Sequence, residues 1–212
     1  MNAPTNTSDT NNDTSPSIAY ALNGNCYVNL TNKCTLRCKF CPKFNKQWDI
    51  KGYNLHLQDD PTVKHVIEAI GDPAQYKEIV FCGLGEPTMK LNKLLWLAKT
   101  LKKQNTRLRL NTDGLGSLVN GMDITQKLAD NIDAISISLN AQNEEIYNLH
   151  CRPPQMGTYN ALLDFIDAIS KKMDDVTLTA IDGLSGVDIQ ACKNIAAKYK
   201  VNFRKRTLDN VG

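Results

Sequence analysis

Residues 26–42 have the sequence CYVNLTNKCTLRCKFCP, in which a short strand-forming run is followed at once by three closely spaced cysteines. Residues 26–30 are rich in the side chains that favour a pleated, buried strand. Cys34, Cys38 and Cys41 are spaced C-x3-C-x2-C. In barrels of parallel strands, functional groups lie on the loops after the carboxyl ends of the strands. The stretch therefore predicts a parallel-stranded domain with a metal-binding loop after its first strand.

The three thiolates favour an iron–sulfur centre over a structural zinc site. Clustered thiolates select zinc or iron–sulfur centres, and structural zinc needs four ligands where this loop offers three. Three cysteines can bind three irons of a [4Fe–4S] cluster and leave the fourth iron open to a small molecule. Phe40, next to the third cysteine, can shield such a cluster from water and tune its potential. Unpaired structural thiols or an incomplete zinc loop are the alternative.

This spacing, with an aromatic residue before the third cysteine, resembles the signature of the radical S-adenosylmethionine (SAM) enzymes. The resemblance implies that the open iron chelates the amino and carboxylate groups of SAM. It also implies one-electron cleavage of SAM to methionine and a 5′-deoxyadenosyl radical, which removes a hydrogen atom from a substrate. In such enzymes the cofactor supplies the chemistry, and the protein positions the parts and excludes water.

A glycine-rich turn follows the next predicted strand. Residues 78–82 form an apolar run typical of a buried parallel strand, and Gly83, Gly85 and Glu86 come directly after it in the sequence GLGEP. The two glycines allow close backbone approach or positive φ. The turn resembles the SAM motif of the family, whose backbone and acidic side chain receive the methionine ammonium group. The Gly-x-Gly-Glu-Pro form also resembles that of the radical SAM RNA methyltransferases.

Polar residues also lie at or after the later strands. Ser136 and Ser138 share one face of a predicted strand, and buried hydroxyl groups on such a face need partners. The resemblance implies that small polar residues here contact SAM. Asn111 and Asp113 either bind a ligand or form an ordinary turn.

Arg152, in a proline-rich loop, is either a surface residue or a bidentate partner of the SAM carboxylate. The predicted cofactor-binding residues are Phe40, Gly83, Gly85, Glu86, Asn111, Asp113, Ser136, Ser138, Asn140 and Arg152.

Strand and helix signals alternate along the chain. One predicted helix has Asp60 as its N-cap and Pro61 at its first position, and another is capped by Thr158. Six such units are too few to close an eight-stranded barrel. We therefore expect an α/β fold, a partial, open (β/α)6 TIM-type barrel of parallel strands. The predicted strands are residues 26–30, 78–82, 107–111, 133–140, 176–182 and 201–206.

Composition limits the class of protein. The chain of 212 residues suffices for one domain with a sizeable core, residues 18–212, after a polar tail at residues 1–17 that we expect to be disordered. The net charge of +3 is too small to indicate nucleic acid or a membrane as partner. We expect neither a membrane span nor a secretory signal.

Seven cysteines do not suggest a disulfide framework. Because the cysteine motif needs reduced thiolates, we expect a reducing, cytoplasmic location. We also expect reduced flavodoxin or ferredoxin as electron donor.

More narrowly, residues 25–206 resemble the TatD-family-associated radical SAM proteins. The name reflects fusion or gene neighbourhood with TatD-type metal-dependent hydrolases and gives no substrate. The substrate is therefore unknown, and the candidates are a protein or a component of a TatD-type hydrolase pathway. The stretches that carry this resemblance are YVNLTN at 27–32, FCGLGEPT at 81–88, SISLNA at 136–141 and YNLHCRP at 147–153.

Three other functions stay open: a glycyl-radical-type activase acting on a partner protein, a radical SAM methyltransferase, and a non-catalytic iron–sulfur sensor. The glycine-rich turn and the paired serines argue against the sensor, because a sensor needs no SAM pocket. The roles of Cys82 and Cys151 are not assigned. The basic run at residues 204–206 either meets an anionic substrate or partner or only forms the basic end of the chain.

The cysteine loop generates the first prediction. Anaerobic reconstitution should load about four irons per chain, and replacing Cys34, Cys38 and Cys41 with Ala should abolish the cluster. Replacing Cys26, Cys151 or Cys192 should leave iron content unchanged. Iron and zinc are measured by elemental analysis of protein purified without oxygen. A single zinc with no iron uptake would contradict the prediction.

Overall fold

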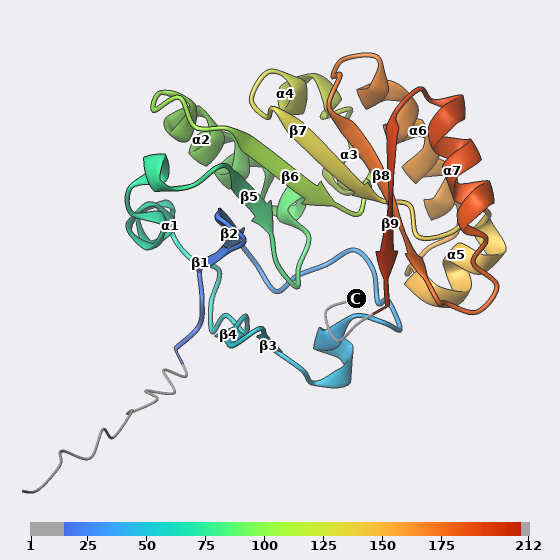
Figure 1. Cartoon of the computed structure of the whole chain (residues 1–212), viewed down its shortest axis with the longest axis horizontal. Coiled ribbons are helices and arrows are strands. Elements are labelled where there is room, and N and C mark those ends of the chain that lie inside the picture. Colours follow the sequence, from blue (N-terminus) through green and yellow to red (C-terminus); the bar gives the residue numbers. More distant parts are fainter. Residues whose placement is uncertain (1–14, 209–212) are drawn as a thin grey trace, which may run out of the picture.

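The computed structural model describes residues 15–208 (Figure 1). Most of the tail predicted at residues 1–17 lies outside the described residues. At its end, the backbone N–H of Ser17 already donates a hydrogen bond to the carbonyl of Asn54, at 2.6 Å. Within the described part of the chain, no helix has the length and apolar character needed to cross a membrane.

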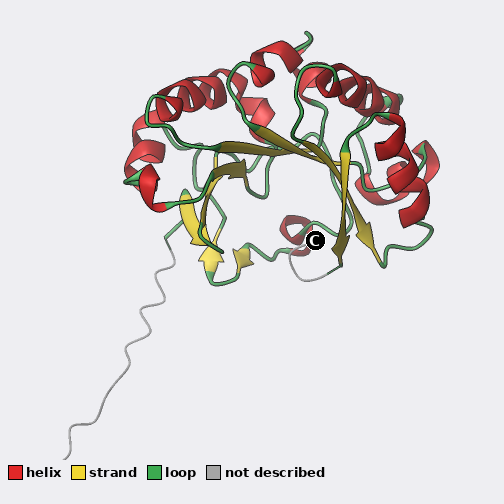
Figure 2. Cartoon of the chain, turned by 45° about the horizontal axis from the view of Figure 1, so that its top comes forward, coloured by secondary structure: helices red, strands yellow, loops and turns green. Residues whose placement is uncertain are grey.

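Seven strands form the main sheet, in the order β1-β2-β5-β6-β7-β8-β9. The six strands from β2 onward are mutually parallel, as the sequence predicted, and β1 runs antiparallel at one edge. The sheet curves into an arch with the helices along its convex side (Figure 2). The fold is therefore a partial TIM-type barrel. The strands are β1 Ala19–Leu22, β2 Asn25–Asn29, β5 Ile79–Cys82, β6 Leu108–Thr112, β7 Ala134–Ser138, β8 Val176–Asp182 and β9 Asn202–Thr207.

Helices connect successive parallel strands, and a small hairpin interrupts the first connection. The hairpin pairs β3 Asp49–Ile50 with β4 Tyr53–Asn54. Three short 3-10 segments are η1 Pro42–Asn45, η2 Pro73–Gln75 and η3 Pro87–Lys90. The α-helices are α1 Val63–Ile70, α2 Leu91–Lys102, α3 Gly116–Asn120, α4 Thr125–Ala129, α5 Glu144–Cys151, α6 Thr158–Ser170 and α7 Ile189–Lys198.

Alternation along the strands gives the sheet two chemically different faces. On β7, Ile135 and Ile137 are fully buried in the hydrophobic core that the strands share with the helices. Ser136 and Ser138, which point the other way, line a cavity on the concave face. Core packing therefore covers the convex face and leaves polar side chains on the concave face.

The structure corrects two predicted helix caps. The N-cap of α1 is Thr62, whose hydroxyl oxygen accepts a hydrogen bond from the backbone N–H of His65 at 3.2 Å. Asp60 instead forms a salt bridge with Lys90 at 2.5 Å. Thr158 is the first residue of α6 rather than its cap, and its hydroxyl donates to the carbonyl of Gln155. A long-range salt bridge takes up the side chain of Asp60, and a local bond within the preceding turn takes up that of Thr158.

The remaining differences lie outside the parallel core. β1, the β3–β4 hairpin and α3 had no clear signal in the sequence. α5 extends through Cys151, so this cysteine lies in the last turn of a helix and not in a loop. It is fully buried. Its burial bears on the methyltransferase alternative, which needs an accessible thiol.

Candidate iron–sulfur and ligand-binding site

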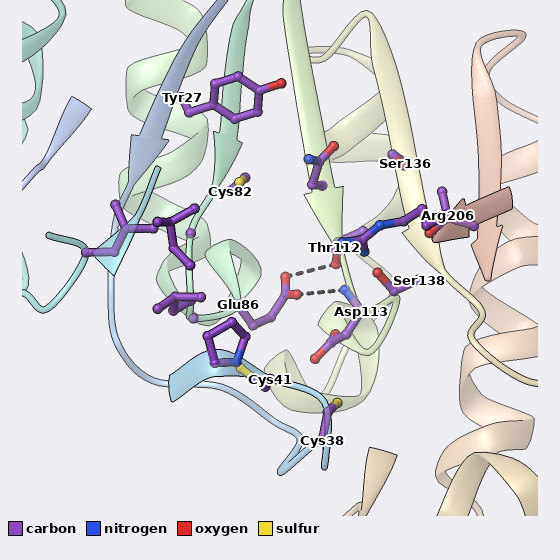
Figure 3. Close-up of a pocket in the computed structure, with 18 of the residues that line it drawn as sticks. Tyr27, Cys38, Cys41, Cys82, Glu86, Thr112, Asp113, Ser136, Ser138 and Arg206 are labelled. Carbon is purple, nitrogen blue, oxygen red and sulfur yellow. Dashed lines mark hydrogen bonds between the residues drawn. The ribbon is translucent and has the colours of Figure 1, made fainter. Parts of the chain in front are cut away.

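A cavity of about 680 Å³ lies on the concave face, at the carboxyl ends of the parallel strands (Figure 3). Parts of the chain that are far apart in sequence meet there: the cysteine loop, the glycine-rich turn and the ends of β6 and β7. Nine of the ten residues predicted to bind a cofactor line it together with the three motif cysteines. These residues are Cys34, Cys38, Phe40, Cys41, Gly83, Gly85, Glu86, Asn111, Asp113, Ser136, Ser138 and Asn140.

The cysteine loop is attached to the carboxyl end of α5. The backbone N–H of Arg37 donates to the carbonyl of Cys151 at 3.1 Å, and that of Lys39 donates to the carbonyl of His150 at 2.8 Å. On the other side, the hydroxyl of Thr35 donates to a carboxylate oxygen of Asp113. These contacts hold the thiol-bearing segment between α5 and the end of β6.

Burial makes the thiolate forms of the motif cysteines costly in the protein alone. It raises the pKa of Cys34, where the nearby Asp113 carboxylate adds to the effect, and it raises the pKa of Cys41. A hydrogen bond with the Cys151 thiol and then burial raise the pKa of Cys38 well above its usual value. Thiolates are the forms that bind metal, and iron bound here would offset their charge and release the thiol protons.

Three buried polar atoms support the fit of a cluster and a polar ligand. The hydroxyl of Tyr147 and the Oδ1 atoms of Asn111 and Asn140 have no hydrogen-bond partner within residues 15–208. Buried polar groups almost always have partners. Burial raises the pKa of Tyr147, and Cys151, Asp113, Cys38 and Cys34 raise it further, which places its hydroxyl near the cysteine loop. Both asparagines line the cavity.

No three His, Cys, Asp or Glu side chains among the described residues are grouped closely enough to hold one metal ion. A [4Fe–4S] cluster uses a different geometry, because each thiolate binds a separate iron.

Glu86 joins the glycine-rich turn to the end of β6, and its side chain is 3% exposed. Its Oε1 atom accepts bonds from the backbone N–H of Thr88 at 2.9 Å, from the Thr88 hydroxyl at 2.6 Å and from the Thr112 hydroxyl at 2.9 Å. Its Oε2 atom accepts one bond, from the backbone N–H of Asp113 at 2.8 Å (Figure 3). Oε2 thus accepts fewer of these bonds than Oε1, and the carboxyl group of Asp113 lies beside it.

Asp113 serves both as a turn residue and as part of the cavity wall. Its Oδ1 atom accepts from the backbone N–H of Leu115 at 3.0 Å, which forms the turn that the sequence suggested. The side chain also lines the cavity. Burial and the nearby Glu86 carboxylate raise the pKa of Asp113 well above its usual value. The two carboxyl groups thus form a closely spaced pair beside the cysteine loop.

The glycines bring the turn against the first strand and the cysteine loop. A Cβ atom on Gly85 would lie 2.0 Å from the carbonyl oxygen of Thr31 and 2.6 Å from that of Lys33. Gly83 has φ +126°, and a Cβ there would lie 2.5 Å from Oδ1 of Asn29. Gly85 therefore allows the turn to contact the beginning of the cysteine loop. Gly83 allows a close approach to Asn29 at the end of β2 and a positive φ.

Arg152 is the predicted site residue that the structure places elsewhere. It is exposed, forms the left-handed C-cap of α5 with φ 49° and does not line the cavity. Arg204 and Arg206 of β9 line the cavity instead. Their spacing of two residues in a predicted strand is the signal that would have placed both on one face.

Comparison with known proteins identifies the family of the chain. Residues 28–198 match the family described as the Radical SAM superfamily. The chain belongs to this superfamily. The narrower resemblance to TatD-associated members finds no support in the comparisons.

One curated relative is the dual-specificity RNA methyltransferase RlmN of Buchnera aphidicola subsp. Schizaphis graminum. It is 30% identical to the chain over 151 residues, which are 65% of this chain and 38% of the relative. The chain thus spans well under half of that protein's length.

Solved structures of radical SAM proteins share the fold. Streptococcus suis SuiB bound to its precursor peptide SuiA has a TM-score of 0.62 at 12% identity, covering 86% of this chain and 39% of SuiB. A radical SAM methyltransferase from Sphaerobacter thermophilus has a TM-score of 0.59 at 13% identity, covering 89% of this chain and 68% of that one. At these identities the likeness concerns the fold alone.

Replacing Gly85 with Ala tests the contact between the turn and the cysteine loop. Because φ is not positive at Gly85, the cost comes from the clash with two backbone carbonyls. We expect it to lower the free energy of unfolding by at least about 3 kcal/mol, measured by urea denaturation. Gly52→Ala is the control: nothing lies within 4 Å of its Cβ position, so only the strain of φ +85° remains. It should cost about 1–2 kcal/mol, and equal costs for both variants would contradict the structure.

Proposed function

We propose that the protein is a radical SAM enzyme that acts on an unidentified substrate. A [4Fe–4S] cluster bound here would supply the electron that cleaves SAM to methionine and a 5′-deoxyadenosyl radical, which abstracts hydrogen from that substrate. The observation that carries the proposal is that the cysteine motif and the glycine-rich turn line the same cavity. Reduced flavodoxin or ferredoxin is the proposed electron donor, in a reducing cytoplasm.

The protein's part in this reaction is to bind, orient and exclude water. Cys34, Cys38 and Cys41 would hold three irons. The negative charge of the Glu86 carboxylate, which lines the cavity, suits the ammonium group of SAM, by a charge-assisted bond. Leu36 adds apolar surface to the cavity wall, which helps to keep water from a reactive radical.

Asn111 and Asn140 offer unpartnered carbonyl oxygens to the hydroxyl or amino groups of a bound nucleoside. Ser136 and Ser138 provide hydroxyl groups on the neighbouring strand. Phe40 is partly buried against the core beside the cysteines, which suits a role in shielding the cluster.

The similarity to RlmN makes methyl transfer the second candidate. A methyl-accepting cysteine needs an exposed, mobile thiolate with a lowered pKa. Cys151 is fully buried at the end of α5, where it accepts a hydrogen bond from Asn140 at 3.7 Å. Cys82 lines the cavity, but it ends a strand and burial raises its pKa. These features favour hydrogen abstraction without net methyl transfer.

We also propose that the protein belongs with the TatD-family-associated members of the superfamily. The support is the four sequence stretches named above, among them YNLHCRP at residues 147–153. That stretch includes the end of α5 to which the cysteine loop is attached. A TatD-type hydrolase or its pathway is accordingly the proposed biological partner.

Glu86 provides a test of SAM binding. Glu86→Gln should retain the iron content but weaken SAM binding by roughly 10- to 150-fold, because it loses a charge-assisted bond worth about 1.5–3 kcal/mol. Affinity is measured by anaerobic titration calorimetry. Gln is preferred to Ala because it keeps an acceptor for the buried donors around Glu86. Glu144→Ala, on exposed α5 surface, is the control, and unchanged SAM affinity in Glu86→Gln would remove Glu86 from the site.

The products of SAM decide the function. With dithionite or reduced flavodoxin, the cluster-loaded protein should release methionine and 5′-deoxyadenosine, resolved by chromatography and mass spectrometry. The variant with Cys34, Cys38 and Cys41 all replaced by Ala should release neither. Stoichiometric S-adenosylhomocysteine that is lost on Cys151→Ala or Cys82→Ala would establish methyl transfer in place of the proposed reaction.

A further inference from the structure

Two arginines lie on the β9 side of the cavity. Arg204 and Arg206 are two residues apart on this strand, so both face the concave surface and line the cavity. Lys205, between them, faces the other way and forms a salt bridge with Asp182 at 2.8 Å. Arg206 reaches into the cavity beside Ser138 and Thr112 (Figure 3). The strand thus presents two guanidinium groups to the cavity and keeps its lysine outside.

Arg204 differs from Arg107 and Arg109 in how its charge is balanced. Arg109 bonds to Glu78 at 3.1 Å, and Arg107 bonds to Asp175 at 2.6 Å. Arg204, by contrast, forms no salt bridge with any carboxylate in residues 15–208. The hydrogen bond that its side chain makes there is a long one, 3.4 Å from Nη2 to the hydroxyl oxygen of Ser136. A guanidinium carries five N–H donors and a full charge, so Arg204 can bind an anion.

A second cavity adjoins the first at this position. It has a volume of about 380 Å³ and lies on the same face of the sheet, toward the beginnings of the strands. Arg204, Ser136, Asn111 and Tyr27 line both cavities. Ligand sites in proteins commonly occupy about 300–1,000 Å³. The concave face therefore has room for a second molecule beside one bound next to the cysteines.

We propose that Arg204, with Arg206, binds an anionic group of the substrate, a carboxylate or a phosphate, where the two cavities meet. The planar fork of arginine matches the paired oxygens of both groups. The inference rests on the proposed function, in which the open iron beside the cysteine loop would bind the carboxylate of SAM, as the family resemblance implies. It therefore leaves these arginines for the substrate.

Inorganic phosphate and acetate serve as probes for the two anion classes. Each is titrated into the cluster-loaded protein, with and without saturating SAM, at an ionic strength held constant with chloride. The dissociation constant is obtained from the rise in melting temperature. Wild-type protein should bind at least one probe in the presence of SAM. Stronger binding of phosphate would identify a phosphorylated substrate, and stronger binding of acetate a carboxylate.

Arg204→Gln should weaken probe binding at least about tenfold. Arg204→Lys, which keeps the charge and loses the fork, should weaken it less. Lys205→Gln is the matched control, because it removes the same charge from the same strand but on the outer side. Its affinity for the probe should equal that of the wild type.

Three results would overturn the inference: no probe binding, equal weakening by Arg204→Gln and Lys205→Gln, or loss of probe binding when SAM is present. The last result would assign the arginines to SAM itself. Formation of 5′-deoxyadenosine is measured separately on the same preparations. If the protein binds the probe through Arg204 but forms no 5′-deoxyadenosine, the anion site is supported and the proposed function is contradicted.

Discussion

The buried carboxylate of Glu86 is the contact on which the site depends. Through its side chain it bonds to the donors of Thr88, Thr112 and Asp113, and through its backbone N–H it bonds to the carbonyl of Lys33 at 2.8 Å. One residue therefore joins the glycine-rich turn, the end of β6 and the beginning of the cysteine loop. The carboxylate is stabilised because several donors converge on it in a buried place, where each hydrogen bond is strong and an unmade one is costly.

The curved sheet explains why these ends can meet around an open space. In a closed eight-stranded barrel the interior is filled by layers of side chains. Here the concave face carries small or polar residues such as Ser136, Ser138 and Asn111, while the isoleucines of β7 pack against the helices. Most of the apolar side chains are buried between the sheet and the helices, and a smaller cluster of Tyr20, Ile50 and Leu55 packs beside the cavity. The rest of the concave side is left for ligands, with carboxyl groups near the cysteine loop and arginines on β9.

Much of this was predictable from the sequence because the signals are local. Each parallel strand is a short apolar run, and the cysteine spacing and the GLGEP turn lie within a few residues. The alternation of residues also places Ser136 and Ser138 on one face of their strand. Because parallel strands have their carboxyl ends at the same edge of the sheet, the cysteine loop and the GLGEP turn were expected to meet there. The hairpin β3–β4 has strands of two residues each, which are too short to produce a periodic signal.

Arg152 was predicted to bind the cofactor and Arg204 was not among the predicted site residues, and both errors have one physical cause. Whether an arginine reaches a cavity depends on the direction in which its segment leaves the preceding element and on how the sheet curves. Arg152 adopts a left-handed conformation that ends α5 and turns the chain outward. Arg204 reaches the cavity because the sheet curves enough to turn β9 toward it (Figure 2). The spacing of residues in the sequence shows which side chains share a face of β9, but it does not show how strongly the sheet curves.

The attachment of the cysteine loop to α5 has a consequence for biosynthesis. Arg37 and Lys39 are held by the carbonyls of Cys151 and His150, so the loop lacks these partners until α5 has been synthesised. Contacts between such distant residues form late, because closing a long loop costs entropy. We therefore expect the loop to reach its final geometry only after α5 has folded, so that a cluster bound by the three thiols would be loaded after that step.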